Sequence, residues 1–341
     1  MTLLLLKKML FDPEFRKSVK MFKVSAPIYA FYAFGLLSDA GALPLLKKGA
    51  SLGEVMRTHG LRNKKMLEHM LDFLVGQKVL TFRGGKYFFS RLPPEINEKN
   101  YAFLETHFPA SVEWVEELRR HAPRVLKTGK TIAYTGFSRR KLLDLWDAIM
   151  REAPLPLREY AIEKFVHSVP EDARILDYGC GSGIGLESIL KKSGKKVFLT
   201  GSDPSSKYLV LARKNLRKLY LTTKSGLVRE NILRTKLINS ASLPARKTYD
   251  IVFMSLVLNH VTAKKRIGLF KKVFRALNKG GRIVIFQITH ASKHDRSPIF
   301  LMHVIPSHKD YPFRDELARD MHSVFGNASV KLNGSVFIAE K

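Results

Sequence analysis

The residues that point most clearly to chemistry are a carboxylate and a run of glycines. Asp177 opens the sequence D-Y-G-C-G-S-G-I-G, in which Gly179, Gly181 and Gly183 alternate with other residues. Glycine allows a ligand to lie directly against the backbone, and a helix that begins here would offer its unpaired N–H groups to that ligand. This segment therefore predicts a binding site for a small molecule.

The spacing of the glycines decides which small molecule is expected. The third residue after Gly181 or Gly183 is neither glycine nor alanine, so the G-x-G-x-x-G/A fingerprint of dinucleotide-binding proteins is absent. The Asp177 carboxylate would repel a pyrophosphate but would favour an ammonium group. Asp203 follows the next expected strand, where it can accept hydrogen bonds from ribose hydroxyls. An amine and a ribose in one ligand describe S-adenosylmethionine, which we expect as the cofactor.

Alternating strands and helices must position these residues. From residue 173 onward, apolar runs typical of strands cover residues 174–177, 196–200, 226–229, 249–254 and 282–288, and helical patterns cover 205–220 and 263–277. Such alternation predicts an α/β fold with a mostly parallel sheet. The C-terminal segment differs, because residues 328–332 and 335–339 flank Asn333-Gly334 and predict a hairpin.

The first hundred residues show a different pattern. Ser51 and Glu54 form a capping box at the start of a short helix, and residues 63–76 place apolar side chains at helical spacing. Residues 79–82 and 87–89 then flank Gly84-Gly85 as a hairpin, so the segment predicts a winged helix. Residues 21–46 are almost uniformly apolar, which predicts a helix buried on all sides, in a core or against a partner subunit.

At this point the sequence resembles the class I S-adenosylmethionine-dependent methyltransferases over roughly residues 165–341. Five features occur in the family's order: the glycine motif, Asp203, the pair Glu230-Asn231, the segment 249–260, and Leu277-Asn-Lys-Gly-Gly before the fifth strand. The resemblance implies a seven-stranded, mostly parallel Rossmann-like sheet with a reversed last strand. It also implies a set of cofactor-binding residues: Asp177, Gly179, Gly181, Gly183, Asp203, Asn231 and Ser255.

Within that set, the resemblance implies a part for several residues. Gly179 and Gly181 would line the methionine end, with Asp177 near its amine, and Asp203 would hold the ribose. Asn231 would contact the adenine amine, where the family often has an aspartate; an amide there can donate or accept and carries no charge.

A winged helix before such a domain is similar to the small-molecule O-methyltransferases. This resemblance implies a winged-helix dimerisation domain at residues 1–100, a helical linker region at 101–165 and a methyltransferase domain at 166–341. It further implies a homodimer that methylates a small, aromatic or apolar molecule at a hydroxyl group. Plant-type members carry their catalytic base in a Leu-His-Asp-Trp motif, whereas here Asn259 takes the place of that histidine. His260, one residue later, is then the first candidate for the base, followed by His290 and His303.

Composition leaves two alternatives open. The formal net charge of +29 is spread along the chain and would suit a nucleic-acid methyltransferase or a winged-helix regulator that binds nucleic acid. Against the first, Ser255-Leu-Val-Leu stands where enzymes that methylate base amines have an N/D-P-P-Y motif. The single cysteine, Cys180, and the absence of an 18-residue apolar run predict a cytoplasmic protein without a transmembrane segment. We expect no metal site from the sequence.

Overall fold

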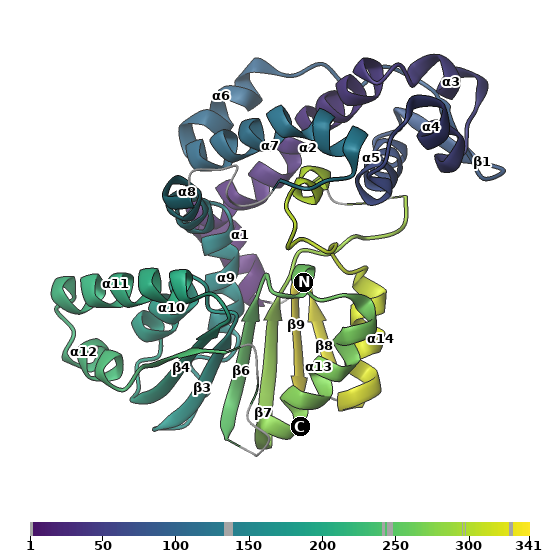
Figure 1. Ribbon diagram of the computed structural model, residues 1–341. Coiled ribbons are helices and arrows are strands. Elements are labelled where there is room, and N and C mark those ends of the chain that lie inside the picture. Colours follow the sequence, from purple (N-terminus) through teal and green to yellow (C-terminus); the bar gives the residue numbers. More distant parts are fainter. Residues whose placement is uncertain are drawn as a thin grey trace. The chain divides into compact units, whose positions relative to one another are not determined.

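The computed structural model describes residues 3–132, 139–240, 243, 248–294, 296, 298–326 and 330–341. Internal contacts divide the chain into two compact units, each described below by itself. The sheet unit comprises Met1–Phe15, Pro154–Ile288 and Asp315–Lys341, and the helical unit comprises Arg16–Ala153 and Thr289–Arg314 (Figure 1).

The sheet unit is built on seven strands in the order β5-β4-β3-β6-β7-β9-β8. Neighbours from β5 to β7 are parallel, whereas β9 is antiparallel to both β7 and β8. This confirms the expected seven-stranded sheet with a reversed last strand and a C-terminal hairpin. The strands are β3 (Ala173–Tyr178), β4 (Val197–Asp203), β5 (Lys236–Asn239), β6 (Tyr249–Ser255), β7 (Leu277–Phe286), β8 (Val330–Asn333) and β9 (Val336–Glu340).

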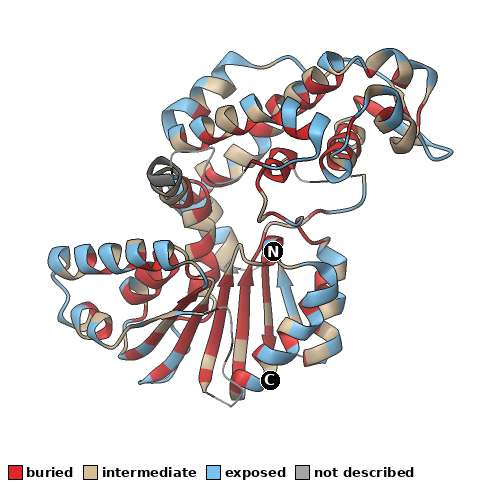
Figure 2. Ribbon diagram, in the orientation of Figure 1, coloured by how far each residue is buried: buried red, intermediate tan, exposed pale blue. Residues whose placement is uncertain are grey.

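Helices cover this sheet and bury its apolar residues, as Figure 2 shows along the strands. On one face, Val252 and Ile283 pack with Phe270, Leu317 and Phe337 in a fully buried cluster. Its helical members come from α13 (Ala263–Ala276) and α14 (Arg314–Phe325). The remaining helices of this unit are α1 (Leu3–Phe11), α9 (Pro154–Glu163), α10 (Ile184–Lys192), α11 (Ser206–Thr222) and α12 (Gly226–Leu233), with a short η1 (Leu258–His260) after β6.

One predicted strand is wrong. Residues 226–229 form the first turn of helix α12, and the third strand of the sheet begins ten residues later, at Lys236. Ser225 caps this helix, because its hydroxyl accepts a hydrogen bond from the Val228 N–H at 3.3 Å. A serine that satisfies a free amide favours a helix start over a strand. Asn231, predicted to follow this strand and to contact the adenine, therefore lies on helix α12.

The helical unit contains the predicted helix-turn-helix and hairpin. Its elements are α2 (Pro13–Asp39), α3 (Leu43–Lys48), α4 (Leu52–His59), α5 (Lys64–Gly76), β1 (Leu80–Arg83), β2 (Lys86–Phe89), α6 (Glu98–His107), α7 (Pro109–Thr128), α8 (Arg139–Arg151) and η2 (Phe300–Val304). The Ser51–Glu54 capping box is present in both directions, at 3.2 and 2.6 Å. Gly84 and Gly85 both have positive φ, as the tight turn between β1 and β2 requires.

The expected boundaries at residues 100 and 165 do not match these units. Residues 101–153 belong to the helical unit, where Leu104, Phe108 and Ala153 pack against Ile28 of α2. The distant segment Thr289–Arg314 also belongs to the helical unit. Helix α2 is also less buried than expected. It is long and apolar enough to cross a membrane by length and composition, and 33% of its most apolar window is buried, but a core helix can pass the same test.

Candidate functional site

The predicted cofactor residues gather at one edge of the sheet. In the parallel strands β3, β4 and β6, Asp177 pairs with Gly201 and with Phe253, so the carboxyl ends of these strands lie together. Asp203 ends β4 and Ser255 ends β6. In open α/β sheets, ligands bind outside the carboxyl ends of the strands, next to a helix N-terminus. The site is therefore formed by the loops at this edge.

The glycine loop after β3 is held close to its neighbours. The Gly179 N–H donates to the Ser202 carbonyl at 2.7 Å, and the Gly181 N–H donates to Asp203 Oδ2 at 3.0 Å. Gly179 has a φ of 75°, and a Cβ there would lie 2.5 Å from Val257 Cγ2. Gly183, with a φ of 84°, caps helix α10. A side chain at Gly179 would therefore displace the loop or Val257, and Gly183 places the N-terminus of α10 directly after the glycine loop.

Asp177 is buried beneath this loop, with 2% of its surface exposed. Helix α10 can approach it only because residue 185 is glycine: a Cβ there would lie 2.4 Å from Asp177 Oδ2. Burial raises the pKa of Asp177 to about 7; the positive charge of Arg158 opposes this rise and the Asp203 carboxylate adds to it. The ionised carboxylate is thus only partly compensated, and a ligand that brings a positive charge would stabilise it.

Arg158 is a site residue that the sequence analysis missed. It lies on α9 with 5% of its surface exposed, and its Nε donates to Ser255 Oγ at 2.8 Å. Its guanidinium also acts on Asp177. The predicted Ser255 is therefore engaged by an arginine from before the glycine motif, and a buried cation and a buried anion lie at the same edge of the sheet. No local pattern in residues 154–163 indicates this role.

Asp203 organises the loop and stays available for a ligand. Its Oδ2 accepts from Gly181 N–H, as above, and its Oδ1 accepts from the Ser205 N–H at 2.8 Å. Burial raises the pKa of Asp203, while these N–H donors and nearby His260 oppose the rise. A carboxylate has about four lone-pair sites in total, so two hydrogen bonds leave capacity for ribose hydroxyls.

The structure contradicts the adenine contact predicted for Asn231. This side chain is fully buried on α12, where its Oδ1 accepts from the Val197 N–H at 3.0 Å and its Nδ2 donates to the Lys195 carbonyl at 2.8 Å. Val197 begins β4, so Asn231 holds the amino end of the strand whose carboxyl end carries Asp203. The polar side chain at the carboxyl end of β5 is Asn239, which is exposed and pairs in register with Asp203.

The loop after β6 carries the predicted base. Leu256 has a φ of 57°, a strained value for this residue type, and the Leu258 N–H donates to the buried Gln287 Oε1 at 2.9 Å. Asn259 is 3% exposed, and its buried Oδ1 has no hydrogen-bond partner among the described residues. His260 is exposed, with its Nε2 3.2 Å from Asn259 Nδ2. The strained backbone therefore presents a buried amide and an exposed imidazole side by side.

The other two candidate bases lie in the helical unit. His290 is fully buried, and its Nε2 is 3.1 Å from Asp310 Oδ1. His303 is 4% exposed and lies 3.1 Å from His69. They belong to a network of histidines and carboxylates within that unit, and no sequence pattern indicates it.

These residues fit S-adenosylmethionine. The carboxyl edge offers an incompletely compensated buried carboxylate for an ammonium group, a guanidinium for a carboxylate, and Asp203 for ribose hydroxyls. The absence of side chains at Gly179 and Gly185 lets the loop pack against Val257 and lets helix α10 pack against Asp177. A zwitterionic amino acid joined to a nucleoside matches this set of groups.

Comparison with known proteins supports the same assignment. A family model described as a methyltransferase domain matches residues 175–281. The ubiquinone/menaquinone biosynthesis C-methyltransferase UbiE of Wigglesworthia glossinidia brevipalpis is 30% identical over 126 residues, which are 37% of this chain and 46% of that protein. The chain thus spans less than half the length of this curated relative.

Two solved structures resemble nearly the whole chain. The CurJ carbon methyltransferase aligns with 99% of this chain and 96% of its own, with a TM-score of 0.65 and 14% identity. An O-methyltransferase family 2 protein from Planctomyces limnophilus, in complex with apigenin, aligns over 93% of this chain and 96% of its own, with a TM-score of 0.56 and 16% identity. At such identities these likenesses show the fold. Together with the family match, the strand order and the glycine loop, they establish that this chain contains a class I S-adenosylmethionine-dependent methyltransferase domain.

Proposed function

We propose that the protein transfers the methyl group of S-adenosylmethionine to the hydroxyl group of a small aromatic or apolar molecule. The observation that carries this proposal is the pair of buried opposite charges, Asp177 and Arg158, beside a glycine loop that is hydrogen-bonded to Asp203. An ionised carboxylate whose pKa is raised to about 7 destabilises the folded protein when no ligand is bound. It is explained by a ligand whose cation replaces the lost hydration.

Each residue of the edge then has a defined part in holding the cofactor. Asp177 would pair with the ammonium of the methionine portion and Arg158 with its carboxylate, because the two side chains bring matching charges to one place. Asp203 would accept hydrogen bonds from the ribose hydroxyls. We propose that Asn239, at the end of β5, faces the adenine in place of Asn231.

The chain contributes alignment and one proton acceptor to the reaction. When bound, the cofactor supplies a methyl group that its sulfonium charge activates for a one-step displacement. Alignment of the acceptor oxygen with that methyl group provides most of the rate enhancement in such a reaction. We propose that His260 accepts the hydroxyl proton, and that Asn259 Oδ1, which is buried without a partner among the described residues, positions the acceptor.

A carbon atom is the second candidate acceptor. The 30% identical relative is named a C-methyltransferase, and the structure with the TM-score of 0.65 is named a carbon methyltransferase. These names favour a carbon acid, such as a molecule with two neighbouring carbonyl groups, as a substrate class to be tested in parallel. Phenols and such carbon acids share the need to lose a proton to a base.

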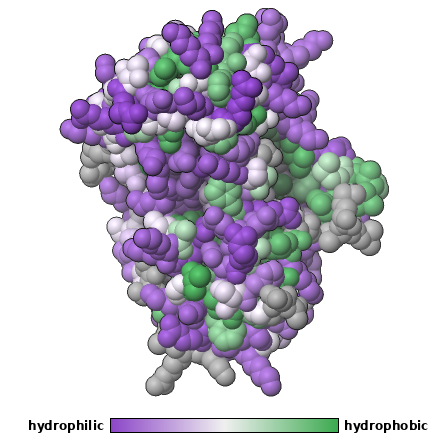
Figure 3. Space-filling model, turned by 90° about the vertical axis from the view of Figure 1, so that its right-hand side faces the viewer, coloured by the Kyte–Doolittle hydropathy of each residue, from purple (hydrophilic) through white to green (hydrophobic). Residues whose placement is uncertain are grey.

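Partners and location complete the proposal. We propose a cytoplasmic homodimer, in keeping with the resemblance to two-domain O-methyltransferases. The net charge of +29 gives the protein a hydrophilic surface, which dominates the face seen in Figure 3. Such a surface attracts polyanions without sequence preference, so nucleic acid is included in the assay as an alternative acceptor.

The test is a transfer assay on one panel of acceptors. Phenols, quinols, 1,3-dicarbonyl compounds, transfer RNA and duplex DNA are incubated with labelled S-adenosylmethionine, and product NMR distinguishes O-methyl from C-methyl groups. We expect methylated phenols and no methylated nucleic acid. Asp203→Asn should weaken cofactor binding at least tenfold by calorimetry. Asp172→Asn is the matched control, because Asp172 lies before β3 with 53% of its side chain exposed. Methylated nucleic acid alone, or unchanged cofactor affinity in Asp203→Asn, would refute the proposal.

A further inference from the structure

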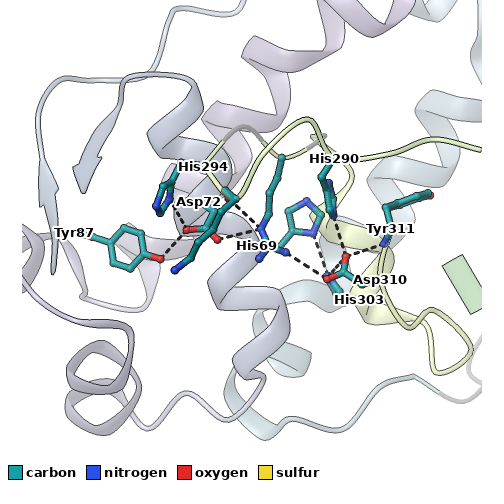
Figure 4. A network of polar contacts seen from close by, with 10 residues as sticks. His69, Asp72, Tyr87, His290, His294, His303, Asp310 and Tyr311 are labelled. Atoms are coloured by element: carbon teal, nitrogen blue, oxygen red, sulfur yellow. Dashed lines mark hydrogen bonds and ion pairs between the residues drawn. The ribbon is translucent and has the colours of Figure 1, made fainter. Parts of the chain in front are cut away.

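The helical unit contains a buried cluster of imidazoles and carboxylates that the mechanism proposed above does not use (Figure 4). His69 lies on α5, His303 on η2, and Asp310 on the segment that follows η2. One donor atom from each of these three residues lies within 4.8 Å of the others, and both histidines are at least 96% buried. We propose that His69, His303 and Asp310 bind a divalent transition-metal ion, with Zn²⁺ as the best match.

The separations between the donor atoms suit such an ion. His69 Nδ1 and His303 Nε2 are 3.1 Å apart, and His303 Nε2 and Asp310 Oδ1 are 3.8 Å apart. A tetrahedral Zn²⁺ with bonds of about 2.0–2.1 Å places its ligands roughly 3.3 Å apart. These two separations lie on either side of that value, and the third pair, His69 and Asp310, lies within 4.8 Å. Two histidines, one carboxylate and a water molecule would complete a four-coordinate site.

The two imidazoles face each other through ring nitrogens. His69 Nδ1 and His303 Nε2 are 3.1 Å apart, so in the absence of an ion one of them must donate a proton to the other. With an ion between them, both ring nitrogens would serve as acceptors and both rings would carry their protons on the opposite nitrogens.

The charges of the cluster also leave room for a cation. Arg296 faces two carboxylates at once: its Nε donates to Asp72 Oδ2 at 3.0 Å and its Nη1 donates to Asp310 Oδ2 at 3.3 Å. Asp72 is fully buried and also lies 3.1 Å from His294 Nδ1, so with neutral histidines one guanidinium faces two carboxylates. Lys65 is exposed and donates to the Lys309 carbonyl at 3.1 Å. Buried charges are normally paired or bind metals, so a cation is the expected compensation.

Neighbouring groups fix the orientation of the carboxylate. The Tyr311 N–H donates to Asp310 Oδ1 at 2.8 Å, and His290 Nε2 lies 3.1 Å from the same oxygen. Hydrogen bonds of this kind orient the ligands of metal sites and are part of their affinity. His290 is thus a positioning residue in this proposal.

The site would join parts of the chain that are far apart in sequence. His69 and His303 are separated by 234 residues, and both lie within the helical unit. An ion bound by both would tie the segment Thr289–Arg314 to helix α5. Because the ion binds the folded chain and not the unfolded one, it would raise the stability of this unit.

The experiment uses the full chain without a histidine tag, stripped with a chelator and dialysed against Zn²⁺ or Co²⁺. We expect one ion per chain by mass spectrometry and the strong d–d absorption of a four-coordinate Co²⁺ site. Asp310→Asn should lower affinity about a hundredfold or more, and His290→Gln about tenfold. His121→Ala is the matched control, because His121 lies on α7 of the same unit with 30% of its side chain exposed.

Two outcomes would overturn the proposal: a wild-type chain that binds no stoichiometric ion, or Asp310→Asn with wild-type affinity. Circular dichroism in chelator shows whether each variant folds. If Asp310→Asn does not fold, the wild-type chain decides alone, because Zn²⁺ must raise its Tm relative to chelator. An unchanged Tm would refute the site.

Discussion

Replacing Asp177 with asparagine should make the cofactor-free protein more stable while it weakens cofactor binding. The carboxyl group is 2% exposed, and burial raises its pKa from 3.8 to about 7. Between these two pH values the folded protein binds more protons than the unfolded chain. The ionised form therefore destabilises the fold progressively as the pH rises through this window, and the penalty is complete above it.

The size of the effect follows from the shift. At about 1.4 kcal/mol for each pH unit, ionising Asp177 costs the fold roughly 4 kcal/mol at high pH, as an upper limit that already includes Arg158. Asparagine keeps the shape and carries no charge. The stability of Asp177→Asn relative to wild type should therefore increase by about 2–3 kcal/mol from pH 5 to pH 8.

Urea denaturation followed by circular dichroism at these two pH values measures this difference. Asp172→Asn serves as the control at an exposed aspartate, because 53% of the Asp172 side chain is exposed. In calorimetry, wild-type protein should bind S-adenosylmethionine more tightly as the pH rises from about 6 to 8, since ionised Asp177 pairs with the ammonium group. A stability gap between Asp177→Asn and wild type that stays constant with pH would show that Asp177 titrates normally, and the reasoning about this site would fail.

Three further substitutions test the site. Gly185→Ala should lower the free energy of unfolding by about 1–3 kcal/mol, because the new Cβ would meet Asp177 Oδ2. Gly268→Ala is the control: its Cβ would meet no atom within 4 Å, so it should stabilise helix α13 by about 0.5–1 kcal/mol. Equal effects of the two substitutions in urea denaturation would contradict the close packing of α10 on Asp177. Asn231→Ala should cost about 1–3 kcal/mol, because it leaves buried backbone groups unpaired, and should keep cofactor affinity within about twofold; a tenfold loss in calorimetry would restore its adenine role. Arg158→Met should weaken cofactor binding about tenfold and move its pH dependence upward, because the cation that opposes the raised pKa of Asp177 is gone. Unchanged affinity would exclude contact between Arg158 and the cofactor, and an unchanged pH profile would exclude its action on Asp177.

The local part of the site was predictable from the sequence. Asp177, the glycines and Asp203 lie within 27 consecutive residues of a strand–loop–helix–strand segment. Their spacing alone determines that they meet at the carboxyl edge of a parallel sheet, because parallel neighbours align their ends. The capping box at Ser51 and the two glycine turns were predictable for the same reason: the contacts that form them span only a few residues.

The error at Asn231 shows where such reasoning fails. The segment 226–229 is short and apolar, and periodicity does not distinguish a short helix from a short strand. Once the strand was misplaced, its following polar residue was assigned to the wrong end of the sheet. The partners of Asn231, near residues 195 and 197, are more than thirty positions away, so no local pattern reveals them.

What the sequence by itself determined is the fold class, the cofactor and the glycine loop, because each depends on residue types at short, fixed spacings. Only the tertiary structure brought Arg158 to Ser255 across 97 positions and His69 to His303 across 234. Such contacts are decided by how helices and loops pack, and packing depends on the shapes of side chains from the whole chain. A buried arginine or histidine carries no mark in the sequence that tells it from an exposed one.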